Sequence, residues 1–567
     1  MILPSATSAR VPSTTITVNT TADGTGGPDC TLRDAIAAAN TDTVAGGCSA
    51  GHRADTIDFS VSGQINLGST LPAVASDLTI DGSGQSIVVS GQGAVRVLEV
   101  SAGASLTLAV LTIADGDAAN AGGILNGGTL HVSNSTLSGN KTETFANGGG
   151  IWNTAEGTLM VRRSSFSGNG DGNLTLGAGI YNSGRARVEN STFADNEADH
   201  GGGIFNAGRL AVRDSTFTGN SAGEGGAIHN IAPTLSIANS SFVGNYTTEG
   251  SGGAISSRDR TTLTVANSIF SENGASDAGA IASEGTLIVA HSTFEGNDAN
   301  GGGAIESLGT LTVTDSTFTG NSAISGAGIH MIGVGTIRGS TFALNTADYA
   351  AGIQNVGTLT VSNSTFAGNT AVIPYGGPGG AIANSGTLTL TSSTLFGNAA
   401  PEGAGIANDG TATLNNTMIA GSQGGNCSGA FDASSTSNMS NDPTCGPGFL
   451  QVGLADLNLG PLGDNGGPTQ TIALGPGSVA IDAGDNAAAA GLITDQRGPG
   501  YPRIVNGRVD IGAFEVQRRR SGTCLNPSKS TVTSPLTSNP ASPSPAQAQW
   551  KPILLPERLQ PPCRGAK

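Results

Sequence analysis

Two glutamates stand where a polysaccharide-cleaving site could be built, but no second acid is predicted beside either one. The chain repeats a pattern about 24 residues long, so stacked repeats bring together residues one repeat apart. Glycoside hydrolysis needs two carboxylates about 5–10 Å apart. Glu295 and Glu306 lie within one repeat, and the residues one repeat further on are Thr319 and His330. The sequence therefore predicts no pair of carboxylates at this place.

The other residues that could do chemistry are scattered. Asp81 and Asp115 stand in Leu-Thr-Ile-Asp-Gly and Leu-Thr-Ile-Ala-Asp-Gly, where an Asp side chain ordinarily caps a turn. A polysaccharide lyase needs a basic residue, and Lys141 is the only lysine before the C-terminal tail. The six histidines occupy different positions of the repeat, so we expect that they do not converge: His52, His131, His200, His229, His291 and His330. We predict no catalytic residues.

Four aspartates near the C-terminal end carry oxygen ligands of the kind that Ca²⁺ prefers. Their spacing matches no calcium-loop signature, so roles in turns and caps are the alternative for Asp482, Asp485, Asp495 and Asp510. We expect no cofactor, with calcium at these aspartates as the one metal to consider.

Six cysteines form three local pairs. None has the C-x-x-C spacing of a zinc site and no histidine cluster lies near them, which argues against zinc. Short loops closed on either side of a long cysteine-free stretch favour disulfides formed in an oxidising compartment, with reduced thiols as the alternative. The pairs are Cys30 with Cys48, Cys427 with Cys445, and Cys524 with Cys563.

Three short phrases recur in fixed order and account for most of the chain. One is Gly-(Gly/Ala)-x-Ile, one resembles Gly-Thr-Leu-Thr-Val at 309–313, and one ends in Phe-x-x-Asn or Leu-x-x-Asn. An Asn at a turn tolerates left-handed backbone and can form a ladder of amides with its counterparts above and below. These ladder asparagines are Asn140, Asn169, Asn196, Asn220, Asn245, Asn273, Asn297, Asn321, Asn345, Asn369 and Asn398.

Each repeat predicts three short strands separated by turns. In 310–314 the apolar Leu311 and Val313 alternate with Thr, and Ile305 and Phe318 supply the apolar residues of the other two strands. No repeat holds a helical pattern, and a propeller blade would need about 40 residues. The pattern predicts an all-β protein, a right-handed parallel β-helix of about 15 coils with three strands per coil.

The predicted β-helix spans residues 57–420 and needs a cap at each end, because open strand edges invite aggregation. Residues 14–56 are the N-terminal cap, with an amphipathic helix at 31–40 that carries Leu32, Ala35, Ile36 and Ala39 on one face. Residues 421–515 are the C-terminal cap. Residues 1–13 are expected to be flexible, and 516–567 to be a disordered, basic, Pro- and Ser-rich tail.

Charge and hydropathy exclude some partners. The net charge is −17, and the tail carries eight Lys and Arg against one acid, which leaves −24 on residues 1–515. Such a body repels phosphate backbones, so nucleic acid is not expected as a partner. No segment approaches the roughly 20 apolar residues of a transmembrane helix. The N-terminal residues also lack the apolar core of a signal peptide.

Two motifs in the first 420 residues resemble known families. Literal Gly-Gly-Ala-Ile, with Phe-x-x-Asn, is similar to the repeats of chlamydial polymorphic outer-membrane proteins; it stands at 225–228, 252–255, 302–305 and 379–382. The segment Cys-Thr-Leu-Arg-Asp-Ala-Ile at 30–36 resembles the CSLREA-type motif of bacterial surface proteins, with Thr for Ser and Asp for Glu.

Residues 461–515 are similar to the choice-of-anchor Q domain. The matching phrases are Gly-Pro-Leu-Gly-Asp-Asn-Gly-Gly-Pro-Thr at 460–469, Ala-Ile-Asp-Ala-Gly-Asp at 480–485, Thr-Asp-Gln-Arg-Gly at 494–498 and Asp-Ile-Gly-Ala-Phe-Glu at 510–515. Together these resemblances imply a bacterial right-handed β-helix protein, either secreted or at the cell surface and adhesin-like. They imply no catalytic residues, and no sorting motif follows residue 515.

From these observations we expect a monomeric, non-catalytic adhesin that binds a glycan or a surface protein along the flank of the coils. A pectate-lyase-like polysaccharide lyase or a glycoside hydrolase is the first alternative, because β-helices host both. A purely structural stalk is the second. A charged cluster two or three coils deep on one flank would favour an enzyme, and none is evident from residues one repeat apart.

Overall fold

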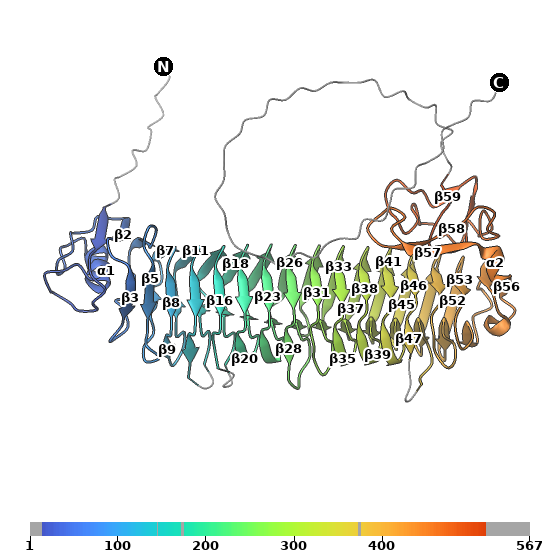
Figure 1. Cartoon of the computed structure of the whole chain (residues 1–567), viewed down its shortest axis with the longest axis horizontal. Coiled ribbons are helices and arrows are strands. Elements are labelled where there is room, and N and C mark those ends of the chain that lie inside the picture. The colour runs from blue at the N-terminus through green and yellow to red at the C-terminus, as the bar shows by residue number, and fades with distance from the viewer. Residues whose placement is uncertain (1–13, 144–145, 172–174, 372–375, 518–567) are drawn as a thin grey trace, which may run out of the picture. The chain divides into compact units, whose positions relative to one another are not determined.

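The computed structural model describes residues 14–143, 146–171, 175–371 and 376–517. Over these residues the chain winds into a stack of short parallel strands with a helix at its N-terminal end and a smaller module at its C-terminal end (Figure 1). Three strands per coil are present, as predicted. The sheet that begins at β1 has 16 strands, against about 15 coils expected.

One coil shows how the repeat folds. Strand β37 (Thr310–Thr314) is followed by β38 (Thr317–Thr319), the short β39 (Ser322–Ser325) and β40 (Ile329–Met331). In β37 the apolar side chains alternate with exposed Thr, which is the pattern of a strand with one face on the core. Each strand pairs in parallel with the same phrase in the next coil, for instance Leu311 with Gly335.

The strands of successive coils form three long sheets. Sheet 1 runs from β1 (Thr15–Val18) to β52 (Thr411–Asn415). Sheet 2 runs from β3 (Gly63–Asn66) to β56 (Phe449–Gln451), and sheet 3 runs from β6 (Leu98–Val100) to β54 (Cys427–Gly429). The pairings within all three sheets are parallel, so the coils wind in one sense.

A column of stacked phenylalanines fills the interior beneath sheet 2. Nine Phe side chains have no exposed surface, and neighbouring rings stack with centroids 4.6–4.9 Å apart and planes within 8° of parallel. Ile, Leu and Val from the other two sheets complete the core. Burying each such side chain contributes about 1.5–3 kcal/mol, and no coil can bury its own face without neighbours. The rings are Phe166, Phe193, Phe217, Phe242, Phe270, Phe294, Phe318, Phe342 and Phe366.

The predicted ladder asparagines form a continuous hydrogen-bonded chain. From Asn140 to Asn398, the Nδ2 of each donates to the Oδ1 of the next at 2.8–3.0 Å. Each Nδ2 between Asn169 and Asn398 also donates to a Phe or Leu backbone carbonyl. All eleven asparagines are buried, so these bonds replace water for groups that would otherwise be unpaired.

A second amide ladder was not predicted. It joins the asparagines that end the Ile-x-Asn strands of sheet 3, at Nδ2–Oδ1 distances of 2.6–2.8 Å. It is interrupted where Ser257, Ser283, Ser307 and Met331 replace Asn. Its members are Asn126, Asn153, Asn182, Asn206 and Asn230, then Asn355, Asn384 and Asn408.

Several coils carry a fourth short strand between sheets 2 and 3, which the sequence did not predict. These strands form separate small sheets along one edge of the stack (Figure 1). They follow the ladder Asn and precede the Gly pair, and most hold only one buried side chain. We call them the fourth row: β9 (Asp117–Ala118), β13 (Lys141–Thr142), β20 (Glu197–His200), β24 (Ser221–Glu224), β28 (Tyr246–Thr247), β35 (Asp298–Gly301), β39, β43 (Thr346–Tyr349) and β47 (Thr370–Ala371).

The N-terminal end of the stack is covered by helix α1 (Leu32–Thr41), one residue later than predicted. The Thr31 hydroxyl caps it by accepting a hydrogen bond from the Asp34 N–H. The expected apolar face is buried in the same core as the first strands. The disulfide Cys30–Cys48 ties the start of the helix to the loop beyond it. Strand β1 precedes the helix, so the sheet already begins within the predicted cap.

At the C-terminal end, parallel pairing continues past the predicted limit at residue 420. Strands β54, β55 (Asn438–Ser440) and β56 extend sheets 2 and 3, although their sequences lack the repeat phrases. The disulfide Cys427–Cys445 spans this region, joining β54 to the short 3-10 helix η1 (Pro443–Cys445). Cys524 and Cys563 lie outside the described residues.

The C-terminal module follows these last coils and folds back onto the outside of sheet 2 (Figure 1). It contains α2 (Leu454–Leu457), the antiparallel pair β57 (Leu459–Gly463) and β58 (Thr471–Leu474), and the hairpin β59 (Ile504–Val505) with β60 (Arg508–Val509). Apolar residues of the module pack on Met418 and Met439. The predicted tail begins at 516, and residues 518–567 are outside the description.

Replacing one ladder residue tests the contribution of the ladder. We expect Asn297→Ala to lower the free energy of unfolding by about 3 kcal/mol or more, because it removes an acceptor for Asn273 and a donor to the Phe270 carbonyl and leaves buried polar groups unpaired. The matched control is Asn300→Ala, an exposed Asn in the same repeat, which should change stability little. Urea unfolding followed by circular dichroism measures both, and equal midpoints would contradict the role of the ladder.

Candidate functional site

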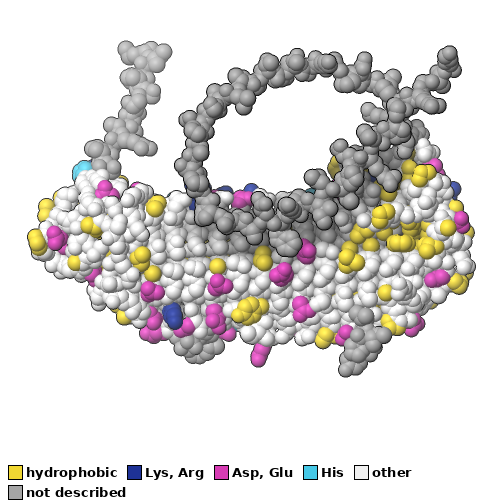
Figure 2. Space-filling view, viewed as in Figure 1, with side chains coloured by type: hydrophobic (Ala, Val, Ile, Leu, Met, Phe, Trp, Pro, Cys, Tyr) yellow, Lys and Arg dark blue, Asp and Glu magenta, His cyan; other side chains and the backbone are white. Residues whose placement is uncertain are grey.

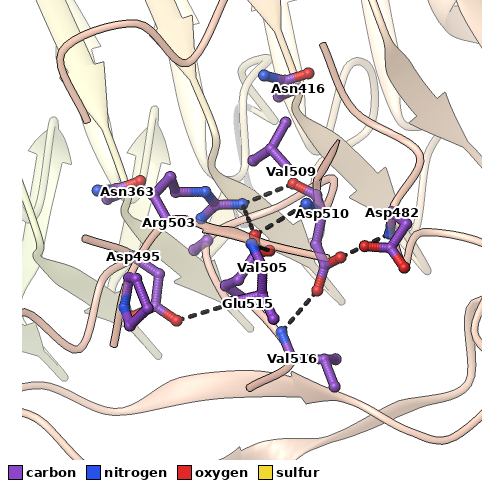
Figure 3. Close-up of polar contacts among 12 residues, drawn as sticks. Asn363, Asn416, Asp482, Asp495, Arg503, Val505, Val509, Asp510, Glu515 and Val516 are labelled. Carbon is purple, nitrogen blue, oxygen red and sulfur yellow. Dashed lines mark hydrogen bonds and ion pairs between the residues drawn. The ribbon is translucent and has the colours of Figure 1, made fainter. Parts of the chain in front are cut away.

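The aspartates considered as calcium ligands lie in the C-terminal module and are hydrogen-bonded within it. The Asp510 carboxylate accepts from the backbone N–H of Asp482 and of Val516, both at 2.7 Å (Figure 3). The Asp485 carboxylate accepts from the N–H of Ala487 at 2.9 Å. These contacts fit the turn and capping roles that were the alternative to calcium.

Asp495 belongs to a buried group of charges in the same module. Its carboxylate accepts from the Arg497 guanidinium at 2.6 Å and from the Glu515 N–H at 2.9 Å. Beside it, Arg503 and Glu515 are both without exposed side-chain surface, and Arg503 Nη2 lies 3.5 Å from Glu515 Oε2 (Figure 3). The Glu515 carboxylate also accepts from the N–H groups of Val505 and Asp510. The side chains of this group are buried in the interior of the module.

Burial opposes both charges of the Arg503–Glu515 pair. Loss of water raises the pKa of Glu515 to about 8, against its ordinary value of 4.5, although the attraction of Arg503 acts in the other direction. Burial likewise lowers the pKa of Arg503, and the surrounding carboxylates act against that shift. Desolvation therefore disfavours the charged form of both side chains of this pair.

A group of arginines gathers on sheet 1, on a body that is otherwise acidic. Its members come from β15 (Thr158–Arg162), β18 (Arg185–Glu189) and β22 (Arg209–Arg213), three adjacent strands. On the face shown in Figure 2, by contrast, acidic side chains are spread along the stack and few Lys or Arg are visible. We call this group the arginine patch: Arg162, Arg185, Arg187, Arg209 and Arg213.

The charges of the arginine patch are only partly compensated. Glu189 pairs with Arg162 at 2.9 Å and also with Arg187. These contacts lower the pKa of Glu189, whereas its burial acts to raise it. Arg185 and Arg209, however, lie directly opposite one another in the sheet, and neither has an ion pair with another described residue. Like charges in this arrangement destabilise a sheet.

Two hollows meet at Arg185 and Arg209. One has a volume of about 300 Å³ and is lined by Met160, Leu210 and Ala211 together with Arg185, Arg187 and Arg209. The second, of about 460 Å³, lies beside it over the turns between sheets 3 and 1. A lining that combines apolar and cationic side chains suits a sugar ring that carries an acidic group, because the ring offers a C–H face and the substituent a charge.

A second site lies on the other side of the coil, where two columns of outward side chains face each other. One column is the middle residue of the sheet 3 strands, and the other is the last residue of the fourth row. A corner of Gly and Ala residues separates them, as at Gly225, whose φ of +60° and whose missing Cβ, 2.4 Å from the Ile228 carbonyl, require glycine. The tight corner brings the two columns together.

Midway along these columns small side chains leave a pocket of about 270 Å³. Ser256 and Ala282, adjacent in sheet 3, form its base, and charged residues form its walls. We call it the acidic pocket, because its charged lining is Arg258, Asp277, Glu284 and Glu306. Three carboxylates against one guanidinium would repel a polyuronate.

Two of these carboxylates converge with a histidine around Gly301. A Cβ at Gly301 would lie 3.4 Å from His330 Nδ1, 3.6 Å from Glu306 Oε1 and 4.0 Å from Asp277 Oδ1. The two carboxylate oxygens are therefore at most about 8 Å apart, which does not exceed the separation found in glycosidases. Glu306 Oε1 lies 3.2 Å from His330 Nδ1. Burial raises the pKa of Asp277, and the Glu306 charge adds to this effect while His330 opposes it.

Next to the acidic pocket, two of the histidines do converge, which corrects the expectation that none would. The rings of His200 and His229 stack with centroids 5.0 Å apart, and Glu224 Oε2 lies 3.5 Å from His229 Nδ1. Burial lowers the pKa of His229 to about 3, and the neighbouring His200 and Arg258 add to the effect. We call His200, Glu224 and His229 the histidine cluster.

Arg258 joins the histidine cluster to the acidic pocket, because its guanidinium pairs with Glu224 and, at 2.9 Å, with Glu284. These carboxylates raise the pKa of Arg258, against the effect of its burial. A charged strip more than three coils deep therefore exists, contrary to the sequence expectation. The sequence comparison looked one repeat on from Glu295 and Glu306 only. His200 and Glu224 are also one repeat apart, in the fourth row, whereas His229 lies in sheet 3. Comparing the residue before each Gly pair with the residue after each Ile would have found it.

Other residues considered from the sequence stay apart. The Asp81 carboxylate accepts from the Ser83 N–H at 2.9 Å, and Asp115 has a left-handed φ of 49°, so both are turn residues. Glu295 pairs with Thr319 across sheet 2 and Lys141 begins β13. His52, His131 and His291 lie far along the chain from the histidine cluster and are absent from it.

Comparison with known proteins agrees with this architecture. Residues 64–242 match the family described as the right-handed β-helix region. The fold is a right-handed parallel β-helix. The match covers less than half of the chain, from strand β3 of sheet 2 to the coil that contains Phe242. No curated protein sequence matches the chain. Among the described residues, no helix is long and apolar enough to cross a membrane.

The buried pair in the module predicts a dependence on pH. Folded Glu515 holds its proton up to about pH 8, whereas the unfolded side chain releases it near 4.5. Folding therefore takes up a proton between these values, and the stability of the module falls as the pH rises through this window. We expect Glu515→Gln to flatten the profile and the exposed control Glu402→Gln to preserve it. Hydrogen exchange of peptides from 459–516 measures the slope, and the opposite slope would contradict the prediction.

Proposed function

We propose that this protein is a secreted or cell-surface β-helix protein that binds an acidic polysaccharide at the arginine patch. The observation that carries the proposal is the unpaired Arg185 and Arg209, one above the other at the meeting point of two hollows. Two guanidinium groups at the spacing of adjacent strands, about 4.8 Å, can each form two parallel hydrogen bonds with a carboxylate or sulfate. A polymer with repeated charges fits such a row.

The rest of the chain supports an extracellular setting. Two disulfides form in the described part of the chain, and disulfides persist in oxidising compartments. The resemblance of 30–36 to CSLREA-type motifs and of 461–515 to the choice-of-anchor Q domain supports the same location. The net charge of −17 disfavours nucleic acid and leaves the arginine patch as the local attractor for an anionic glycan.

Binding to a defined set of polysaccharides tests this proposal. We expect polygalacturonate or alginate to bind and neutral dextran not to bind, with affinity falling as salt is added. The double variant Arg185→Gln/Arg209→Gln should lower the affinity about tenfold or more, because it removes charge-assisted hydrogen bonds. The double variant Arg53→Gln/Arg338→Gln changes the net charge equally, away from the patch, and should bind normally. Equal binding of dextran, or no binding at all as for a structural stalk, would overturn the proposal.

A second function, glycoside hydrolysis, is supported by the convergence of Asp277, Glu306 and His330. In this reaction Asp277, whose pKa is raised, would protonate the leaving oxygen while Glu306 activates a water molecule that adds to the sugar carbon. The glycosidic bond breaks, and the water proton passes to Glu306. The negative charge of the acidic pocket favours neutral or amino sugars as substrates and disfavours a pectate-lyase-like reaction.

Release of reducing ends from neutral and amino-sugar polymers tests this second function. We expect cleavage by the wild-type protein and its loss, by about 100-fold or more, in Asp277→Asn and in Glu306→Gln. Glu295→Gln replaces an exposed glutamate of the neighbouring phrase and should keep full activity. If no polymer is cleaved, the pocket is not an active site and the binding function stands alone.

A further inference from the structure

The histidine cluster contains three side chains with metal-ligating atoms in close proximity. His200 ends β20, Glu224 ends β24, and His229 is the middle residue of β25 (Ile228–Asn230). His200 and Glu224 are direct partners in the fourth row, and the Gly pair at 225–226 brings His229 beside them. One ligand atom from each lies within 4.8 Å of the others. Among the described residues they form the one such group.

The buried histidine points its nitrogen into this cluster. The His229 side chain is 97% buried, with 3% of its surface exposed, and its Nδ1 makes no hydrogen bond with another described residue. The Nδ1 of His200 is buried and likewise without a hydrogen bond in the described chain. Buried imidazole nitrogens are normally paired. Here Glu224 Oε2 lies 3.5 Å from His229 Nδ1 and the His200 ring stacks on that of His229, so a cation bound among them would satisfy the unpaired His229 nitrogen.

We propose that His200, Glu224 and His229 bind a divalent transition-metal ion of the Zn²⁺ type. Two imidazoles and one carboxylate are a donor set suited to such ions, whereas Ca²⁺ requires oxygen ligands. Metal–ligand bonds of about 2.0–2.2 Å require the three side chains to close around the ion. His200 and Glu224 are partly exposed, at 34% and 24%, and can make this movement, while His229 is held by the core.

Arg258 competes with a metal ion for the Glu224 carboxylate. Its guanidinium contacts the Glu224 carboxylate, so a bound cation has to displace it. Glu284 lies on the other side of Arg258 and accepts a hydrogen bond at 2.9 Å, which gives the displaced guanidinium an existing partner. The arrangement allows the metal and Arg258 to exchange places on Glu224 without leaving a buried charge unpaired.

Metal binding to the full-length, disulfide-bonded protein tests the proposal directly. After treatment with chelator, we expect one equivalent of Zn²⁺ to bind in calorimetry, and Co²⁺ to give the visible absorption of a site with nitrogen and oxygen ligands. Ca²⁺ should not compete. His229→Ala and Glu224→Gln should each weaken binding tenfold or more. Arg258→Gln should strengthen it, because the competing cation is gone.

Controls make each outcome decisive. His291→Ala removes an exposed histidine outside the cluster and should bind Zn²⁺ as the wild type does. If His229→Ala fails to fold, His200→Ala, at a partly exposed position, replaces it. Absence of Zn²⁺ binding, or binding unaffected by every cluster variant, would overturn the proposal. No glycan is present in these measurements, so their result is independent of the proposed polysaccharide binding.

Discussion

In adjacent coils, equivalent residues of the repeat stack directly on one another. This contact between like residues determines which side chains the β-helix can use. Parallel strands are about 4.8 Å apart, close to the 4.6–4.9 Å between stacked Phe rings. An amide is both donor and acceptor, so a column of Asn is self-complementary. A column of like charges is not. The charged content of 12% follows from this constraint, as does the recurrence of Gly, Thr, Phe and Asn.

Some charged residues nevertheless occupy adjacent positions in neighbouring coils, and these exceptions differ in how their charges are compensated. Where charges alternate along the stack, as in Arg162, Glu189 and Arg213, they stabilise one another and need no ligand. The direct contact of Arg185 with Arg209 lacks such alternation. The acidic pocket likewise concentrates carboxylates around a single guanidinium. In a fold that disfavours repeated charges, these two places are the exceptions on which the proposed functions rest.

The repeat phrases predict the three sheets, the interior and the first Asn ladder, because each depends on neighbours at a fixed distance along the chain. They could not predict the histidine cluster, since His200 and His229 stand in different phrases and meet only through the Gly-Gly corner. The strands of the fourth row contain too few apolar residues to be predicted from the sequence. The continuation of sheets 2 and 3 beyond 420 was missed because Cys427 and Asn438 occupy strand positions without the surrounding phrase.

The repeat pattern cannot predict where the C-terminal module docks along the stack, because the surface that the module contacts repeats from coil to coil. Its contacts with the sheet 2 threonines, such as Gln496 with Thr341 and Thr365, would be nearly the same one coil away. The turn positions beside them differ from coil to coil. Asn416 exchanges two hydrogen bonds with Asp485, and Asn363 donates to the Thr494 carbonyl.

A shift by one coil would place Ser392 or Gly339 under these partners, and neither side chain can make the same bonds. Apolar packing on Met418 and Met439 holds the module against the stack, but packing alone is tolerant of sliding. Directional bonds to residues that break the repeat fix its register. The buried group around Arg503 and Glu515 then holds the loops that carry those bonds, so buried charges that are costly to desolvate lie where the repeat cannot specify the structure.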